Sequence, residues 1–90
     1  MEFEFDPAKS ASNKSKHGID FVDAQKLWAD KYSIDFPARD DGEHRLMVVG
    51  MIEDKHWSAV IVVRDGRIRL ISVRRSRSQE VYLYESQRPR

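Results

Sequence analysis

Arginine is concentrated near the C-terminal end of this 90-residue chain. Six arginines fall between positions 64 and 77, and only Asp65 adds an acid to that stretch. The guanidinium group stays charged at physiological pH, and its planar set of N–H donors matches the oxygens of a phosphate. We therefore expect this stretch to bind an anion, and a phosphodiester fits best. The six are Arg64, Arg67, Arg69, Arg74, Arg75 and Arg77.

The two parts of the chain carry opposite charge. Residues 1–63 hold 8 Lys and Arg against 12 Asp and Glu, whereas residues 64–90 hold 8 Arg against 3 acids. This division favours one surface for a nucleic-acid backbone and another for a different partner. An arginine-rich strand that is merely solvated, or that pairs with acids of the helices, accounts for the same composition, so both interpretations stay open.

Length and composition narrow the class of protein. Ninety residues form a single domain, spanning residues 1–90, that buries about 60–65% of its unfolded surface. The chain has no cysteine, so neither disulfides nor thiolate metal sites are available. It shows no signal-peptide pattern and no apolar run near the roughly 18 residues needed to cross a bilayer. We expect a soluble cytoplasmic protein without a membrane segment.

A metal or cofactor site is not expected. The three histidines, His17, His44 and His56, lie on separate predicted elements, and no His-x-x-x-His pair or carboxylate cluster joins them. There is no glycine-rich phosphate loop either. Any chemistry is therefore expected to rest on side chains alone.

The N-terminal part predicts a strand and two helices. Residues 2–5 alternate polar and apolar, and a helix is expected from Pro7, with Asp6 as N-cap, to Lys16 or His17, ending at Gly18. This helix is polar and shows no strong apolar stripe. Asp20 predicts the N-cap of a second helix. Its sheet-packing face would contain Phe21, Ala24, Leu27 and Trp28.

The remainder predicts an antiparallel meander and a last helix. An edge strand is expected at 32–36, closed by Pro37, and three longer strands at 45–52, 57–64 and 67–74. Asp65-Gly66 is a strong signal for a two-residue hairpin. Strict alternation in the last strand would place Arg69, Ile71, Val73 and Arg75 on one face. A helix over 78–87 would turn Val81 and Tyr84 inward.

These elements predict an α+β fold in the order β-α-α-β-β-β-β-α. Two N-terminal helices would pack on a small, mainly antiparallel sheet. The arginine-rich strand is then the last strand of the meander, and its arginines cover apolar neighbours with their methylene stems while the charged ends reach outward.

In its motifs the chain resembles the BrnT toxin family. The resemblance covers nearly the whole sequence in order, and its most specific parts are the helix-ending Lys-His-Gly and the late arginine-rich strand. The residues that carry it are Phe5-Asp6-Pro7-Ala8-Lys9, Asn13, Lys16-His17-Gly18-Ile19-Asp20-Phe21, Ala24, Glu43-His44-Arg45, Gly50 and Arg67-Ile68-Arg69-Leu70-Ile71-Ser72-Val73-Arg74.

The resemblance implies a function, a fold and a partner. BrnT proteins are ribonucleases, the toxin half of bacterial type II toxin–antitoxin pairs, with a compact fold similar to RelE-type toxins. It implies a BrnA-type antitoxin that folds onto the toxin in a hetero-oligomer and carries the DNA-binding part, so that DNA is contacted only indirectly. It also implies cleavage by the 2′-hydroxyl of RNA without a metal or cofactor.

Such cleavage needs a base, an acid and cations for the phosphorane charge. The resemblance and the arginine pattern make Arg69, Arg74 and Arg75 the candidates for charge stabilisation, with Arg64, Arg77 and Arg45 as phosphate contacts. The candidates for proton transfer are His17, Lys16 and Glu43, ahead of His44.

Simpler explanations exist for these residues. Lys16 and His17 would also complement the dipole of a helix C-terminus, and Glu43 to Arg45 would also form a charged start of a strand. A non-catalytic module that binds nucleic acid or an antitoxin through the arginine-rich strand is the alternative function.

Overall fold

The computed structural model describes residues 2–38 and 44–89 and contains a five-stranded sheet with three helical segments. Among the described helices, none is both long and apolar enough to cross a membrane. In chain order the elements are β1 (Glu2–Glu4), α1 (Pro7–His17), the 3₁₀ helix η1 (Asp23–Ala29), β2 (Ile34–Pro37), β3 (Arg45–Ile52), β4 (Lys55–Arg64), β5 (Arg67–Arg75) and α2 (Ser78–Gln87).

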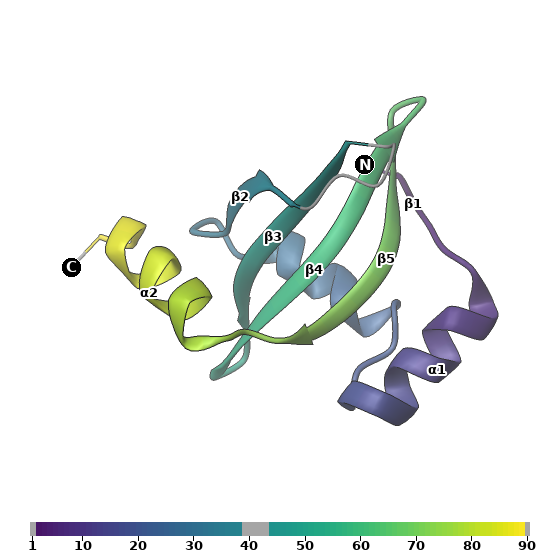
Figure 1. The fold of residues 1–90 in the computed structure, drawn as a ribbon, viewed down its shortest axis with the longest axis horizontal. Coiled ribbons are helices and arrows are strands. Elements are labelled where there is room, and N and C mark those ends of the chain that lie inside the picture. The colour runs from purple at the N-terminus through teal and green to yellow at the C-terminus, as the bar shows by residue number, and fades with distance from the viewer. Residues whose placement is uncertain (1, 39–43, 90) are drawn as a thin grey trace.

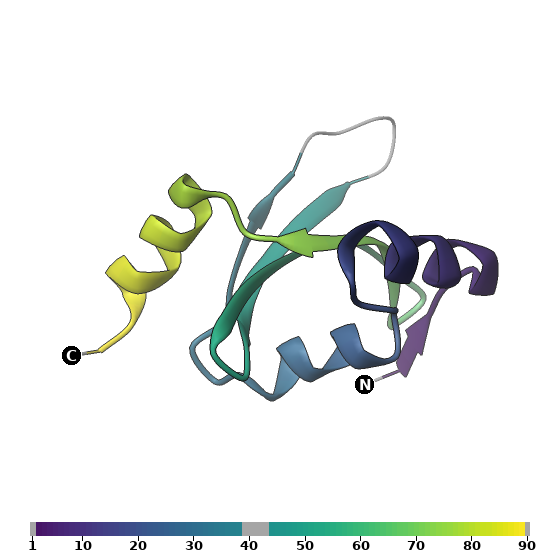
Figure 2. The same ribbon diagram turned by 90° about the horizontal axis from the view of Figure 1, so that it is seen from below.

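The strand order is β1-β5-β4-β3-β2, with β1 parallel to β5 and every other pair antiparallel. Figure 1 shows η1 behind the sheet, α1 beside β5 and α2 beside β3. The perpendicular view in Figure 2 shows η1 packed below the strands. We call the face toward η1 the covered face and the opposite one the open face.

The α+β class is confirmed, whereas the predicted second α-helix is wrong: the segment is a 3₁₀ helix. The N-cap of η1 is Val22 and not the predicted Asp20, although Oδ1 of Asp20 accepts hydrogen bonds from the backbone N–H of Val22 and Asp23 at the start of the segment. Phe21, Ala24 and Leu27 are all fully buried and recur every third residue. That period matches the three residues per turn of a 3₁₀ helix, which brings all three onto one side.

Glycine at position 50 allows η1 to approach the sheet closely. A Cβ atom built there would lie 3.1 Å from Cδ2 of Leu27 and 3.3 Å from Oδ2 of Asp30. An alanine would therefore push η1 away from β3.

The predicted turns and ends are confirmed. The Oδ1 of Asp6 accepts the N–H of Ala8 at 2.8 Å, and α1 ends at Gly18 with φ of 83°. The turn between β4 and β5 has positive φ at Asp65 (50°) and Gly66 (75°), as the two-residue hairpin requires. β2 is an edge strand, and Pro37 is its last residue.

The polar helix α1 docks through two polar side chains. Ser10 and Asn13 are only 7% and 6% exposed. Asn13 donates from Nδ2 to the carbonyls of Ile19 and Val73 and accepts the N–H of Val73 at Oδ1. Ser10 Oγ accepts the N–H of Phe21. Because β1 pairs with β5 only as far as Arg69, the amide of Asn13 continues the backbone pairing at that edge.

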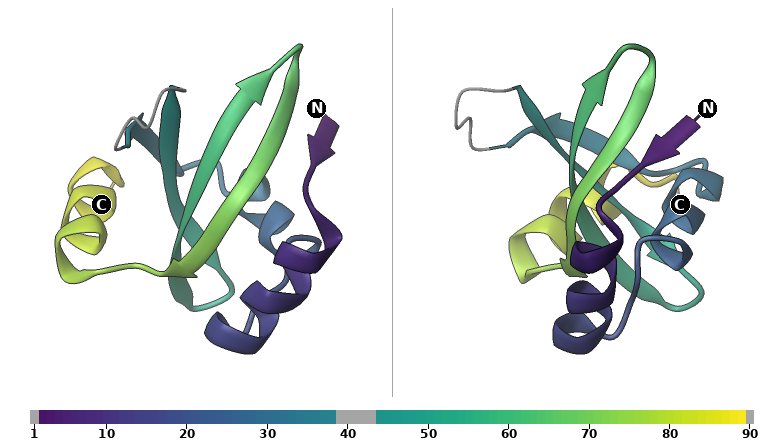
Figure 3. Two further views of the ribbon diagram at one scale, coloured as in Figure 1. Left: turned by 45° about the vertical axis from the view of Figure 1, so that its right-hand side comes forward. Right: turned by 90° about the vertical axis from the view of Figure 1, so that its right-hand side faces the viewer.

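Figure 3 shows β1 and then α1 following one another along the edge of β5. The register of β5 shifts there, because Val60 pairs with Ser72 while Ile61 pairs with Leu70, leaving Ile71 as a bulge. The predicted strict alternation is therefore wrong beyond position 70.

The bulge changes which residues share a face. Val73 joins Ile68 and Leu70 on the covered face, where all three are buried. Arg74 consequently stays on the open face with Arg69, and Arg75 turns to the covered face. Strict alternation also places Arg74 and Arg75 on opposite faces, but with Arg75 on the face of Arg69. The bulge exchanges their faces.

We predict that Asn13→Ala lowers the free energy of unfolding by about 2–4 kcal/mol, because it leaves buried N–H and C=O groups of β5 and the 19–21 segment without partners. Urea denaturation followed by circular dichroism would measure this. The control is Ser12→Ala, an exposed neighbour on the same helix. Equal stability of the two variants would show that the Asn13 bridge contributes little.

Candidate functional site

Four arginines share one end of the open face. The register aligns Arg45, Val62 and Arg69 in a row across β3, β4 and β5. Arg64 pairs with Arg67 at the adjoining hairpin, on the same side of the sheet. Directly paired residues of antiparallel strands point to the same face. The fold thus gathers arginines that are up to 24 positions apart in the sequence.

Val62 lies between two of these arginines and is only 4% exposed, although no helix covers this part of the face. Its cross-strand neighbours, Arg45 and Arg69, are both half-buried, as expected when arginine stems lie over an apolar residue. Within the described residues, Nε of Arg45 is buried and makes no hydrogen bond. An unsatisfied charged donor beside a second guanidinium is suited to receive an anionic oxygen.

Two carboxylates of β1 lie beside this cluster. Glu2 accepts a hydrogen bond from Nε of Arg67 at 3.0 Å, and the nearest N–O distance between Arg69 and Glu4 is 3.7 Å. The first pair is largely exposed, and the second is too long for a hydrogen bond. Exposed pairs of this kind contribute about 0–1 kcal/mol. The Arg67–Glu2 pair is therefore weak, and a competing anion would displace Glu2 from Arg67 at little cost.

A hollow of about 370 Å³ lies between α1 and the bulge of β5 and adjoins the open face. Ser72 belongs to both: it lines the hollow, and it stands in the open-face row with Met47 and Val60. The structure thus brings Lys16 and His17 to the strand that carries Arg69. The lining residues are Lys9, Ser12, Asn13, Lys16, His17, Ile71 and Ser72.

Arg74 lies at the far end of the open face and is bound by α2. Its two terminal nitrogens each donate a 2.8 Å hydrogen bond to Glu80, which also accepts from Ser58 Oγ and from the N–H of Arg77. The hydrogen bonds from Arg74 hold the pKa of Glu80 down at about 2, against a burial effect that raises it. The same bonds raise the pKa of Arg74.

Arg75 and Arg77 lie apart from the arginine row. Arg75 is on the covered face, where its guanidinium lies 5.6 Å from the Trp57 ring centre and Nε donates to the carbonyl of His56. Arg77 is exposed at the start of α2. Glu43 lies outside the described residues. His44 is exposed and directly precedes β3.

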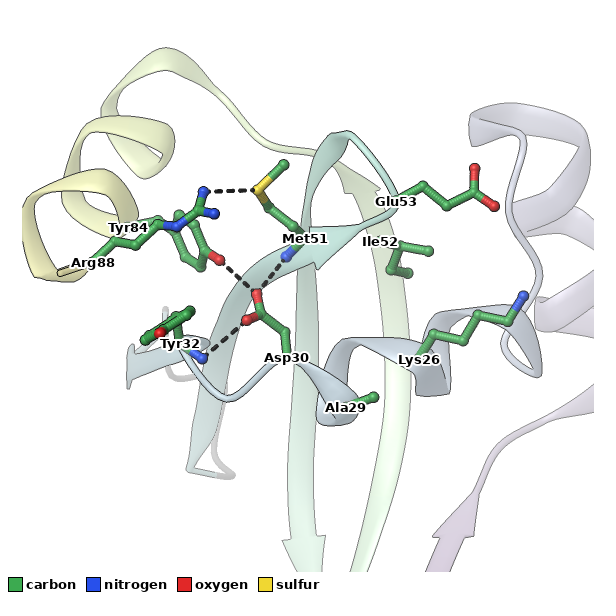
Figure 4. A pocket seen from close by; sticks show the side chains of 9 residues that line it. All are labelled: Lys26, Ala29, Asp30, Tyr32, Met51, Ile52, Glu53, Tyr84 and Arg88. Carbon is green, nitrogen blue, oxygen red and sulfur yellow. Dashed lines mark hydrogen bonds between the residues drawn. The ribbon is translucent and has the colours of Figure 1, made fainter. Parts of the chain in front are cut away.

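A second pocket, shown in Figure 4, is organised around Asp30. Oδ2 of Asp30 accepts hydrogen bonds from Tyr84 (2.6 Å) and the N–H of Met51, and Oδ1 accepts from the N–H of Tyr32. Burial raises the pKa of Asp30, but these hydrogen bonds outweigh it and leave the pKa lowered. Burial and then Asp30 raise the pKa of Tyr84 to about 12. The Asp30 carboxylate therefore links Tyr84 of α2 to the backbone of Met51 in β3, which is a structural role.

Sequence reasoning missed Lys9, Ser12 and Ser72. Positions 9, 12 and 16 follow the spacing of one helix face, and no acid occurs between positions 7 and 17, so this signal was available. Strict alternation predicted that Ser72 shares a face with Arg74. It did not predict that Ser72 lies beside α1, because that position depends on the bulge. The described residues include no cluster of three or more metal-binding side chains of the His, Cys, Asp or Glu type.

We predict that Glu80 makes the stability depend on pH in the acid range. Its pKa is lowered from 4.5 to about 2 in the folded protein, so its contribution is complete above pH 4.5 and is lost as the pH falls toward 2. The loss should be on the order of 3 kcal/mol. Urea denaturation between pH 7 and pH 2 should show a steeper decline for the parent than for Glu80→Gln.

The matched control is Glu53→Gln, which removes an exposed carboxylate in the turn between β3 and β4. It should keep the pH dependence of the parent. A parallel decline of parent and Glu80→Gln would contradict the prediction.

Comparison with known families gives one match. A family model described as "Ribonuclease toxin, BrnT, of type II toxin-antitoxin system" matches residues 5–80. The matched range contains the arginine row and the hollow. No curated protein matches the chain significantly.

Proposed function

The chain belongs to the BrnT family of ribonuclease toxins of type II toxin–antitoxin systems, and from this premise we propose that it cleaves RNA on its open face. The scissile phosphate would lie between the row of Arg45 and Arg69 and the hollow that holds Lys16 and His17. The observation that carries this proposal is the pair of guanidinium groups flanking Val62, one of them with an unsatisfied Nε.

The spacing within the sheet supports this position. The row containing Arg69 and the row containing Ser72 are two residues apart on β4, which is about 6.6 Å. A phosphate above this part of the sheet is within reach of long side chains from β3, β5 and α1. Arg64 and Arg67 at the hairpin, and Arg77 at the opposite end of β5, would contact neighbouring phosphates and hold the strand in register.

The chemistry would proceed through the 2′-hydroxyl. A base removes its proton, the 2′-oxygen attacks the adjacent phosphorus, and the bond to the 5′-oxygen breaks as an acid protonates that oxygen. The products are a 2′,3′-cyclic phosphate and a 5′-hydroxyl. His17 is proposed as the base, and Lys16 as a second candidate for proton transfer. Arg69 and Arg45 would stabilise the phosphorane.

The contacts of Arg74 and Arg75 favour a different role for them. Arg74 is held by two hydrogen bonds to a half-buried carboxylate, and breaking such a pair leaves an uncompensated charge. Arg75 is on the covered face. We therefore propose the reaction without them, and the Arg75→Ala variant below tests this for Arg75.

Membership of the family implies an antitoxin as partner. We propose that a BrnA-type antitoxin covers the open face and stops cleavage by excluding RNA. Contact with DNA would then occur only through the antitoxin.

We predict that Arg69→Ala and Arg45→Ala each lower kcat by about 10²–10³-fold, and His17→Ala by about 10²–10⁴-fold. The substrate is a 5′-labelled single-stranded RNA in EDTA, beside its all-DNA counterpart. Cleavage of RNA alone, with 2′,3′-cyclic phosphate ends, is expected of the parent. Arg75→Ala is the matched control: it removes an arginine from the same strand on the opposite face and should leave kcat near that of the parent.

Unfolding midpoints of all variants would separate loss of activity from loss of folding. Full activity of Arg69→Ala, Arg45→Ala and His17→Ala would refute the proposed site. Intact RNA with retained, salt-sensitive binding, in the presence of translating ribosomes as well, would favour the non-catalytic binding module.

A further inference from the structure

Among the residues that the structure describes, no acidic side chain lines the hollow between α1 and β5. Its polar lining consists of two lysines, a histidine, two serines and the amide of Asn13. The side-chain amide of Asn13 is already hydrogen-bonded to the backbone of Ile19 and Val73. The groups left to face a ligand are therefore two ammonium groups, an imidazole and two hydroxyls, which is a composition suited to an anion.

The basic side chains of the hollow differ from the arginines of β5 in their ion pairs. Arg67, Arg69 and Arg74 each lie within 4.0 Å of a carboxylate. In the part of the chain that the structure describes, Lys9, Lys16 and His17 form no such pair, because α1 has no acid and none lines the hollow. The hollow thus keeps a local positive charge without an internal counter-ion.

The hollow is long enough for more than one phosphate. Lys9 and Lys16 are seven residues apart on α1, which corresponds to about 10 Å along the helix axis. The proposed scissile phosphate lies at the end formed by Lys16, His17 and Ser72. Lys9 and Ser12, at the other end, have no part in that chemistry.

The floor of the hollow is rigidly placed. Asn13 lies between Ser12 and Lys16 on the helix. Its amide is hydrogen-bonded to the backbone of Ile19 and of Val73. The backbone of α1 at Lys9 and Ser12 is therefore anchored relative to β5. Such preorganisation lowers the cost of binding a ligand.

We propose that Lys9 and Ser12 form a second phosphate subsite, which binds the RNA phosphate next to the scissile one. The ammonium group of Lys9 and the hydroxyl of Ser12 donate hydrogen bonds to the phosphate oxygens. The identity of the bound phosphate as the neighbour of the scissile one rests on the proposed ribonuclease function. The subsite positions RNA along the β5 edge and takes no part in proton transfer.

The test is a binding titration with an uncleavable probe, a fluorescent 2′-O-methyl oligoribonucleotide, followed by anisotropy at several salt concentrations. Lys9→Gln should raise Kd about tenfold and reduce the slope of log K against log salt by about 0.7. Ser12→Ala should raise Kd about threefold. In cleavage assays, both variants should raise KM and leave kcat unchanged.

The matched control is Lys14→Gln. It removes the same charge from the same helix, but Lys14 is exposed and does not line the hollow. Its effect on Kd should be less than half as large in log units. Equal effects of Lys9→Gln and Lys14→Gln, or no binding of the probe by the parent, would overturn the subsite.

The two proposals fail in different ways. A parent that binds the probe with the predicted dependence on Lys9 but never cuts RNA would retain the subsite and refute the ribonuclease mechanism. If the parent cuts RNA and Lys9→Gln leaves KM unchanged, the ribonuclease mechanism stands and the subsite is refuted.

Discussion

The pairing of Asn13 with the backbone of Val73 positions the rest of the candidate site. β1 covers the edge of β5 only as far as Arg69, and beyond that point the amide of Asn13 satisfies the N–H and C=O that a further strand would have paired. The same side chain holds the carbonyl of Ile19 and so fixes the start of the segment leading to η1. Because α1 has no strong apolar stripe, loss of Asn13 would weaken the contact that holds the lysines of α1 beside Ser72.

The bulge at Ile71 has an equally wide effect. It allows Val73 to enter the core after Leu70, although the two are three residues apart. In consequence Arg74 points to the open face, where Glu80 of α2 meets it, and Arg75 points to the covered face, where Trp57 meets it. One additional residue in a strand thereby decides on which face each of these two arginines lies.

Local signals in the sequence predicted the parts that depend on local chemistry. The Asp6-Pro7 start and Gly18 end of α1, the Asp65-Gly66 hairpin and the edge strand closed by Pro37 all follow from backbone preferences of single residues. The 3₁₀ form of η1, the bulge and the docking of α1 depend on distant partners. The sequence singled out Asn13 only as part of the family motif, and its structural role could not be predicted because its hydrogen-bond partner Val73 is 60 positions away. The arginine row was beyond prediction for the same reason, since only the register aligns Arg45 with Arg69.

The energetics of pairing separate the arginines into two groups. Arg67 pairs with a largely exposed carboxylate, and such pairs are worth about 0–1 kcal/mol, while Arg69 stands 3.7 Å from Glu4, too far for a hydrogen bond, so an anion would replace either carboxylate more easily than it would open a bidentate pair. Arg74 and Glu80 form a bidentate pair whose side chains are only 23% and 13% exposed, and separating such a pair costs about 3–5 kcal/mol. An RNA strand that gained a contact with Arg74 would lose most of that gain in opening the pair. Under the proposed function, Arg67 and Arg69, together with the lysines of α1 that form no ion pair with a described carboxylate, would therefore cost RNA least to reach, and its path would follow the β5 edge.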